Sequence, residues 1–459
     1  MSTSTRVHPL VLWMLCSLVL LAVPYWNGYP LVYSDTGTYL RTAFSDYSPP
    51  DRPIWYGLFI RYSSLGGLTL WGPVVVQSVL LGLLVAQSIR RMDVDKGVLP
   101  LLLMVLLVLF TGISWYAGQL MPDIFTGIGL LACLLLLGGS GTIGHHLLWL
   151  AALLLSVTLH PGNAPILAGT SVVSALMYPM LRRSLVRVMA GAVLILAFWA
   201  FLPDLSQGLT GRPAARPAHV FLMGRLLDSG VLHPFLEEHC SDRSWELCAH
   251  IDELPTNSQD LLWHSNSPLQ HMGGWAATRS EFNEIIRDAL SEPDLLAGFL
   301  LNTLKNTLVQ LTTISMGRDL AGTWYALPES PPYQQIALHM PHELDAYLAS
   351  RMNRMEGMTA AGSLRFADAA LRSGWILTVA ALAWLLKVRG WPSSRVRGWL
   401  VFAAFALFMN AFICAGTSVV ADRFQSRMSW LVMLVVWSIT GSSILNGSAR
   451  PQPSSHQGS

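Results

Sequence analysis

Charged residues are scarce in this chain. Asp, Glu, Lys and Arg make up 12% of its 459 residues, whereas hydrophobic residues make up 52%. An average soluble domain carries roughly 25% charged residues, about twice this share, so most of the fold must have the lipid bilayer as its solvent. The net charge is only +2, and the Arg residues are spread among loops, which excludes the dense basic face that nucleic-acid binding requires.

Motifs of several common enzyme classes are also missing. The chain contains no Walker A, HExxH or GxSxG sequence. It therefore lacks the nucleotide loop of an ATP-driven pump, the zinc helix of a metalloprotease and the nucleophile elbow of an α/β-hydrolase. A removable signal peptide is not expected, because the apolar run from Pro9 to Pro24 lacks a small-residue cleavage site and is followed by the interfacial aromatics Tyr25 and Trp26.

Long hydrophobic runs, by contrast, are abundant. A helix needs about 17 to 25 mostly apolar residues to cross a hydrocarbon core of roughly 30 Å. Ten runs approach or exceed this length and predict an all-α polytopic membrane protein. The predicted spans lie near residues 9–25, 67–89, 97–114, 123–139, 146–160, 163–181, 188–204, 372–388, 398–415 and 428–446.

Lys and Arg residues in short loops predict the orientation of these spans. Ten spans place three basic clusters and both termini on one face, which the positive-inside rule makes cytoplasmic. The clusters are Arg90, Arg91 and Lys96; Arg182, Arg183 and Arg187; and Lys387, Arg389, Arg395 and Arg397.

Two loops on the opposite, outer face are long: residues 26–66 and residues 205–371. The second contains the run 295–314, whose polar residues at helical spacing favour an amphipathic helix in the outer interface over an eleventh span; both readings stay open here. The chain therefore divides into an N-terminal module of seven spans, a large outer domain, three C-terminal spans and a disordered cytoplasmic tail, at residues 1–204, 205–371, 372–446 and 447–459.

The five cysteines fit this topology. Cys240 and Cys248 share the large outer loop, and a cysteine pair in an oxidising compartment predicts a disulfide. A zinc site with the nearby His239 and His250 is disfavoured, because the spacing is not a CxxC pattern. The other three fall inside predicted spans, where a buried thiol needs no special role: Cys16, Cys133 and Cys414.

Two acidic residues at the outer face are candidate catalytic groups. Asp35 lies in the sequence Ser-Asp-Thr-Gly-Thr shortly after the first span, in a loop that alternates charge, proline and aromatics as a site for an amphiphile would. Asp123 follows Pro122 at the outer end of the fourth span. Each has a structural alternative, because an acidic residue at a helix N-terminus caps the helix and complements its dipole.

Further polar residues at the outer face are candidate substrate ligands. His160 and Asn163 lie in the turn between the fifth and sixth spans and either remain interfacial or reach into a cavity. Arg423 or Arg427 either anchors the last span or offers a guanidinium fork to a phosphate. The first outer loop adds five candidates: Tyr33, Thr36, Tyr39, Arg41 and Arg52.

This layout resembles the GT-C superfamily, the multi-pass glycosyltransferases that use polyprenyl- or dolichyl-phosphate-linked sugars. In that superfamily the first outer loop is long and holds a catalytic acid, and a second long loop commonly follows span seven. By this resemblance, Asp35 matches the first-loop acid and Asp123 a second acidic position known in the lipid A aminoarabinose and protein mannosyl transferase branches. The usual Asp-Glu, Asp-x-Asp or Glu-x-Asp pair is absent, since Thr36 and Gly37 follow Asp35.

The resemblance implies an enzyme of the bacterial inner membrane with a periplasmic site. It would transfer a sugar from a polyprenyl-phosphate carrier to a glycan, lipid or protein acceptor by an inverting displacement. Asp35 would be the general base, and Arg or Lys would stabilise the leaving lipid phosphate. The missing acidic pair argues against a two-carboxylate metal site, so a need for a divalent cation stays open and no other cofactor is expected.

Two rival functions share this topology. An O-antigen-type ligase or polymerase would depend on loop arginines and a histidine, His160 or His219. A transporter or flippase of a lipid-linked saccharide would show internal repeats and ionisable residues inside its spans.

Overall fold

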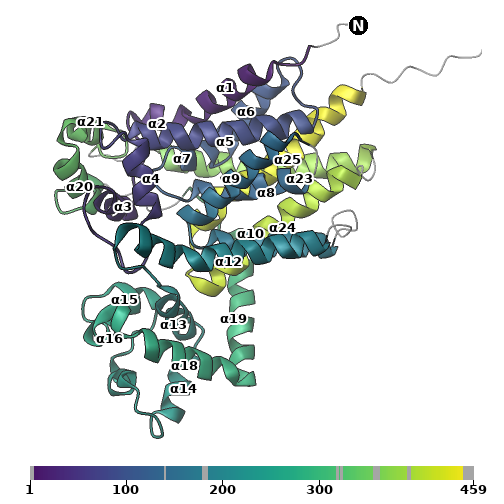
Figure 1. The fold of residues 1–459 in the computed structure, drawn as a ribbon. Helices are drawn as coiled ribbons and strands as arrows, with labels where there is room; N and C mark the ends of the chain where they lie inside the picture. The colour runs from purple at the N-terminus through teal and green to yellow at the C-terminus, as the bar shows by residue number, and fades with distance from the viewer. Residues whose placement is uncertain are drawn as a thin grey trace, which may run out of the picture.

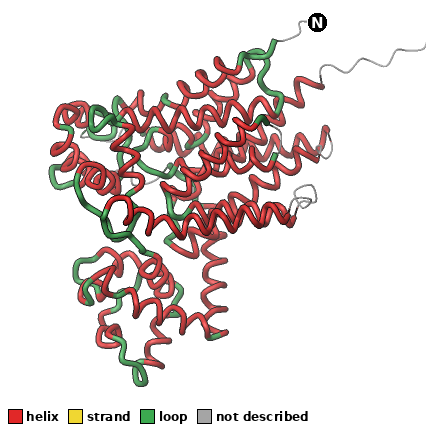
Figure 2. The backbone as a smooth tube through the Cα atoms, in the orientation of Figure 1, coloured by secondary structure: helices red, strands yellow, loops and turns green. Residues whose placement is uncertain are grey.

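The computed structural model describes residues 5–138, 141–177, 185–316, 320, 324–354, 362–389 and 394–447. The described chain is helical throughout, apart from loops and two isolated bridges between single residues (Figure 2). Figure 1 shows a bundle of long helices, with smaller helices at one end and a separate group of helices beside it. The expectation of an all-α fold is confirmed for the described residues.

Six helical segments of the described chain are long and apolar enough to cross a membrane. The first segment contains two consecutive helices, α1 and α2, in one continuous apolar stretch. These candidate spans are α1 with α2 (Pro9–Leu20 and Ala22–Asn27), α5 (Trp71–Arg91), α12 (Leu185–Thr210), α23 (Ser363–Arg389), α24 (Ser394–Thr417) and α25 (Asp422–Gly447).

Four shorter apolar helices coincide with the remaining predicted spans. The structure thus supports a multi-pass membrane protein, while ten complete crossings remain a prediction. The shorter helices are α6 (Leu99–Phe110), α8 (Ile124–Leu137), α9 (Ile143–Leu159) and α10 (Asn163–Met177).

Burial separates the central helices from the peripheral ones. The apolar windows of α5 and α25 are each 61% buried, whereas that of α12 is 22% buried. Since lipid tails are as apolar as Leu, an exposed apolar helix face is stable only when lipid covers it. The centre of the bundle is therefore made by α5, α8 and α25, and the outer helices present Leu, Val and Ile to their surroundings.

Both ends of the described chain lie at the same end of the bundle, which we call the basic end. Arg6 pairs with Lys96 across an isolated bridge, and Gly441 near the end of α25 lies against Leu99 and Val94. This agrees with the expected even number of crossings. Which side of a membrane this end faces remains a prediction, and Arg182, Arg183 and residues 448–459 of the expected tail lie outside the described residues.

At the opposite end, which we call the loop end, residues 26–66 form two short helices, α3 (Ser34–Phe44) and α4 (Trp55–Ser63). A helix from the second long loop, α20 (Pro331–His339), packs directly on α3. Gly37 makes this close approach possible, because a Cβ atom at that position would lie 2.5 Å from Pro331.

The second loop also locks onto the first through Glu343. Its carboxylate accepts a hydrogen bond of 2.6 Å from the Tyr29 hydroxyl and two of 3.2 Å from the Leu70 backbone N–H. Residues 324–349, which contain α20 and α21 (Leu344–Ala349), are therefore part of the loop end of the bundle.

Another part of the second loop, residues 218–299, forms a separate body, which we call the satellite domain. It has its own hydrophobic core, with Val220, Phe235, Leu247, Leu261 and Phe282 fully or almost fully buried. The predicted outer domain 205–371 is thus divided in two by the structure. The helices of the satellite domain are α13 (Ala218–Asp228), α14 (Leu232–His239), the 3-10 helix η1 (Glu246–Glu253), α15 (Ser258–Trp263), α16 (Pro268–His271), α17 (Gly274–Ala277) and α18 (Arg279–Ser291).

Helix α19 (Pro293–Thr312) joins the satellite domain to the bundle. It is not among the candidate spans of the described chain, and Figure 1 shows it running across the direction of α24. The Gln310 side chain bonds both backbone groups of Ala421 at the loop end, while Leu300, Leu304 and Leu308 are exposed. These features agree with the amphipathic helix expected for residues 295–314.

Candidate functional site

The break between α7 (Ile113–Ala117) and α8 brings Asp123 into the protein interior. Residues 118–123 are irregular yet buried, so their backbone groups need protein partners. Leu31 exchanges hydrogen bonds of 2.9 Å with Gly118 and Leu120. The buried Gln77 amide donates to the carbonyls of Ala117 and Gln119 at 2.6 and 2.7 Å. The segment expected to be a short outer loop is therefore buried, irregular backbone that hydrogen bonds from Leu31 and Gln77 hold in place.

Asp35 is brought into place by the first turn of α3. The backbone N–H of Tyr33 donates to the Thr36 hydroxyl at 2.9 Å, and that hydroxyl donates in turn to the Leu120 carbonyl at 3.1 Å. Thr36 therefore fixes the start of α3 against the buried irregular segment. The N-cap residue of α3 is Tyr33, so Asp35 does not cap the helix, although it lies in the first turn, where its charge complements the helix dipole. The Asp35 carboxylate is left to interact with side chains.

The first of two charged clusters is centred on Asp35. Its Oδ1 lies 3.0 Å from Arg52 Nη1, and its Oδ2 lies 3.4 Å from Arg423 Nη1. Asp51 holds the other side of the Arg52 guanidinium at 2.5 and 2.7 Å. The Asp35 side chain is 22% exposed, so this Asp35 cluster remains accessible to a ligand.

Tyrosine rings line the guanidinium groups of the Asp35 cluster. Arg423 lies over the ring of Tyr33 at 4.6 Å, and Arg52 lies 5.3 Å from the ring centre of Tyr39. Burial raises the pKa of Tyr39, so its hydroxyl stays neutral. Burial by itself lowers the pKa of Arg52, but the neighbouring Tyr39, Asp35 and Asp51 raise it overall. Arg52 therefore remains cationic in a setting that excludes much of the water.

The second cluster is centred on Asp123 and is buried. Its carboxylate lies 3.1 Å from Arg427 Nη1, and the two side chains are 4% and 1% exposed. Arg427 also contacts His160 Nε2 at 3.2 Å and the Asn410 amide oxygen at 3.1 Å. Asp123 occupies the N-cap position of α8, but its side chain accepts no capping hydrogen bond. Asp123 therefore makes no capping hydrogen bond, although its place at the N-terminus of α8 still lets its charge complement the helix dipole.

Helix α25 connects the two clusters. Arg423 and Arg427 are four residues apart in its first turns, so they lie on one face of the helix, one above the other. The Arg423 guanidinium faces Asp35, and the Arg427 guanidinium faces Asp123. The arrangement offers an anionic ligand two cations, Arg52 and Arg423, beside a carboxylate that can accept a proton.

The structure thus brings together seven of the predicted site residues and assigns others elsewhere. Asn163 bonds Thr126 and Ser156 in the interior, where it holds helices together. Arg41 is exposed and lies over the ring of Tyr47 at 3.9 Å. His219 lies in the satellite domain, with its ring nitrogens on the carbonyls of Arg216 and Trp275. The seven that meet are Asp35, Asp123, Tyr33, Tyr39, Arg52, His160 and Arg423.

The sequence did not reveal that Arg427 lies at the centre of the buried cluster. Asn410 and Asp51 were not among the predicted site residues. The spacing of Arg423 and Arg427 at i and i+4, just after an acidic helix start, was the available signal. Asn410 inside an apolar run was a second one, since polar residues at membrane depth pair with one another.

No protein-family model, curated protein or solved structure matches this chain.

Proposed function

We propose that this chain is an integral-membrane glycosyltransferase that moves a sugar from a polyprenyl-phosphate carrier to an acceptor at the outer face of a bacterial inner membrane. Asp35 acts as the general base, and Arg52 and Arg423 bind the phosphate of the carrier. The loop end of the bundle faces the periplasm, and both termini face the cytoplasm.

The observation that carries the proposal is the partly exposed Asp35 carboxylate between two arginines. Each Asp35 oxygen has one guanidinium partner. A guanidinium matches a phosphate in two parallel hydrogen bonds, so a phosphate that engages Arg52 and Arg423 would lie directly beside this carboxylate. Phosphate binding and proton acceptance then occur within one cluster at the end of an apolar bundle, where a lipid carrier presents its head group.

The reaction balances with these groups alone. The acceptor hydroxyl oxygen attacks the anomeric carbon while its proton passes to Asp35. The bond between that carbon and the phosphate oxygen breaks, and the negative charge on the departing lipid phosphate is stabilised by Arg52 and Arg423. A single displacement inverts the configuration at the sugar carbon.

Asp123 has a supporting part in this proposal. It is too deeply buried to touch a substrate, but it holds Arg427 and therefore the face of α25 that presents Arg423. We assign it as a positioning residue.

The test is sugar transfer from a purified polyprenyl-phosphate donor by the Asp35→Asn variant. We expect the rate to fall by about 10²- to 10⁴-fold, while Asn keeps an acceptor oxygen for the two arginines, so the stability should fall by only about 1 to 3 kcal/mol. Arg41→Ala is the matched control, because Arg41 lies on the same helix but faces Tyr47, and it should keep the wild-type rate.

Transfer at the wild-type rate by Asp35→Asn would remove this residue from the mechanism. A His160→Gln variant would then separate the rivals: loss of transfer favours a ligase or polymerase, in which a histidine acts. A chain that moves the lipid-linked saccharide across vesicles without forming product would be a transporter.

A further inference from the structure

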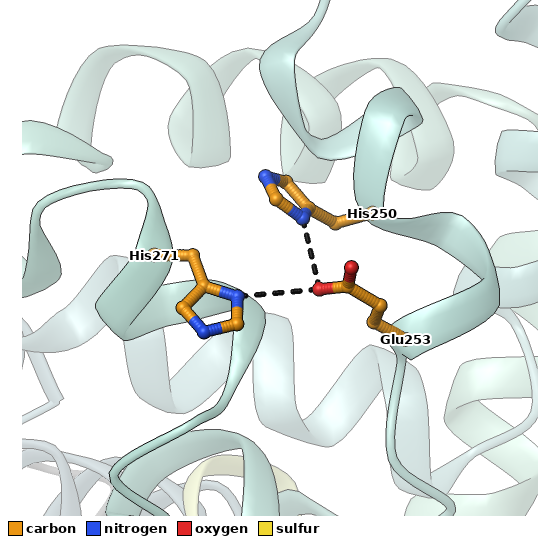
Figure 3. A group of neighbouring side chains, drawn as sticks. All are labelled: His250, Glu253 and His271. Atoms are coloured by element: carbon orange, nitrogen blue, oxygen red, sulfur yellow. Dashed lines mark hydrogen bonds and ion pairs between the residues drawn. The ribbon is translucent and has the colours of Figure 1, made fainter.

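A second group of ligand-type side chains lies in the satellite domain, away from both charged clusters. His250 and Glu253 come from η1, and His271 is the last residue of α16. Figure 3 shows both imidazole rings directing a nitrogen at the same Glu253 carboxylate. This group belongs to no step of the proposed transfer reaction.

The distances within the group suit a small divalent metal ion. Glu253 Oε2 lies 3.0 Å from His250 Nδ1 and 3.2 Å from His271 Nδ1. A tetrahedral zinc ion, with bonds of about 2.0 to 2.2 Å, separates its ligand atoms by about 3.3 Å. All three ligand atoms here lie within 4.8 Å of one another. The three ligand atoms therefore need to approach one another by at most about 1.5 Å to bind one zinc ion. Exposed side chains can make such a movement.

The backbone on one side of the group is braced. The disulfide between Cys240 and Cys248 ends two residues before His250. The Glu281 carboxylate accepts hydrogen bonds of 2.8 and 2.9 Å from the backbone N–H groups of Glu246 and Leu247. At His250 itself the helix is kinked, with φ −115° and ψ 15°. This kink turns His250 and Glu253 toward α16.

We propose that His250, Glu253 and His271 bind one zinc ion. Two imidazoles and one carboxylate are ligands that zinc prefers, whereas Mg²⁺ and Ca²⁺ take oxygen ligands. The side chains are 22%, 52% and 44% exposed in that order, so the metal enters from solvent and keeps a fourth position for water. A bound ion joins η1 to α16 and stabilises the satellite domain.

The Glu253 carboxylate carries its negative charge before any metal ion binds. Hydrogen bonds from His250 and His271 lower the pKa of Glu253. Zinc takes the place of the hydrogen bonds at both Nδ1 atoms, and each imidazole then carries its single proton on Nε2. A simple hydrogen-bonded surface triad would not retain stoichiometric zinc.

The test uses the full-length protein, purified in detergent and stripped with EDTA. After addition of zinc and removal of the excess, elemental analysis should find one zinc per chain, and a large excess of Mg²⁺ should not displace it. Loss of an outer-shell partner typically weakens a metal site by about 10- to 100-fold, so loss of a direct ligand in His271→Ala or Glu253→Gln should exceed that.

His264→Ala is the matched control, because His264 is exposed in the same domain and outside the group. It should retain one zinc. Replacement by Co²⁺ should give the strong visible absorption of a tetrahedral site in the wild type and in His264→Ala. A wild-type chain that retains no zinc would overturn the proposal. So would a His271→Ala chain, eluting normally on gel filtration, that still retains one.

Discussion

The two charged clusters of the bundle use the same chemistry at different depths. In each, a carboxylate meets an arginine of α25 at little more than 3 Å. The Asp35 side chain is 22% exposed, whereas the Asp123 side chain is 4% exposed. Burial therefore assigns the two acids different roles: the accessible carboxylate is free to exchange its partners for a ligand, and the buried one holds its partner permanently.

This difference has an energetic basis. Removing one partner of a buried ion pair leaves an uncompensated charge and costs about 3 to 5 kcal/mol. Breaking an exposed pair costs about 1 kcal/mol or less. A functional anion site needs the weaker, accessible kind of ion pair, because its ions must separate when a substrate arrives.

The largest expected effect comes from Arg427→Met. It leaves Asp123 charged and unpaired in the interior, so we expect a loss of about 3 to 5 kcal/mol and little folded protein after extraction. Yield and melting temperature measure this. Combining it with Asp123→Leu should restore part of the yield, since an apolar pair can replace a buried ion pair. Normal folding of the single variant would mean that the Asp123 cluster is not structural.

Arg423→Lys should give a smaller effect on a different quantity. Lys keeps the charge but loses the planar fork and its stacking on Tyr33. Hydrogen bonds to charged groups contribute about 1.5 to 3 kcal/mol, so the affinity for the donor should fall by about 10- to 100-fold with the melting temperature almost unchanged. Unaltered donor affinity would show that Arg423 does not bind the phosphate.

Asp123→Asn should have the smallest effect on the reaction itself. Asn keeps an acceptor oxygen for Arg427, so we expect a stability cost of about 1 to 3 kcal/mol and a rate per folded molecule within about twofold of the wild type. The measurement is transfer normalised to the folded fraction. A rate that falls as far as in Asp35→Asn would place Asp123 in contact with the substrate and erase the distinction between the clusters.

The sequence predicted the features that depend on local composition. Apolar runs located the helices, and the Cys240–Cys248 pair, bonded in the structure with Cα atoms 5.6 Å apart, followed from their shared loop. Asp35 stood out because it is a carboxylate in a polar run beside an apolar span.

Features that depend on distant partners were not predictable in this way. The pair of Asp123 and Arg427 joins residues 304 positions apart. The packing of α20 on α3 depends on Gly37 meeting Pro331. The segment between the predicted spans 97–114 and 123–139 was expected to be a short outer loop, because its hydrogen-bond partners, Gln77 among them, lie in other helices. No local pattern contains this information.

The distance between Asp35 and Arg423 along the chain, 388 residues, governs when the site exists during biosynthesis. At roughly 5 to 20 residues per second, the ribosome makes Arg423 about 20 to 80 s after Asp35. Throughout that interval Asp35 has Arg52 as a partner but lacks Arg423 of α25, although α20, which ends at His339, is made before Arg423. A chain cut short before α25 therefore lacks one of the two guanidinium groups that face Asp35, and under the proposed function it should not bind the donor as the complete chain does.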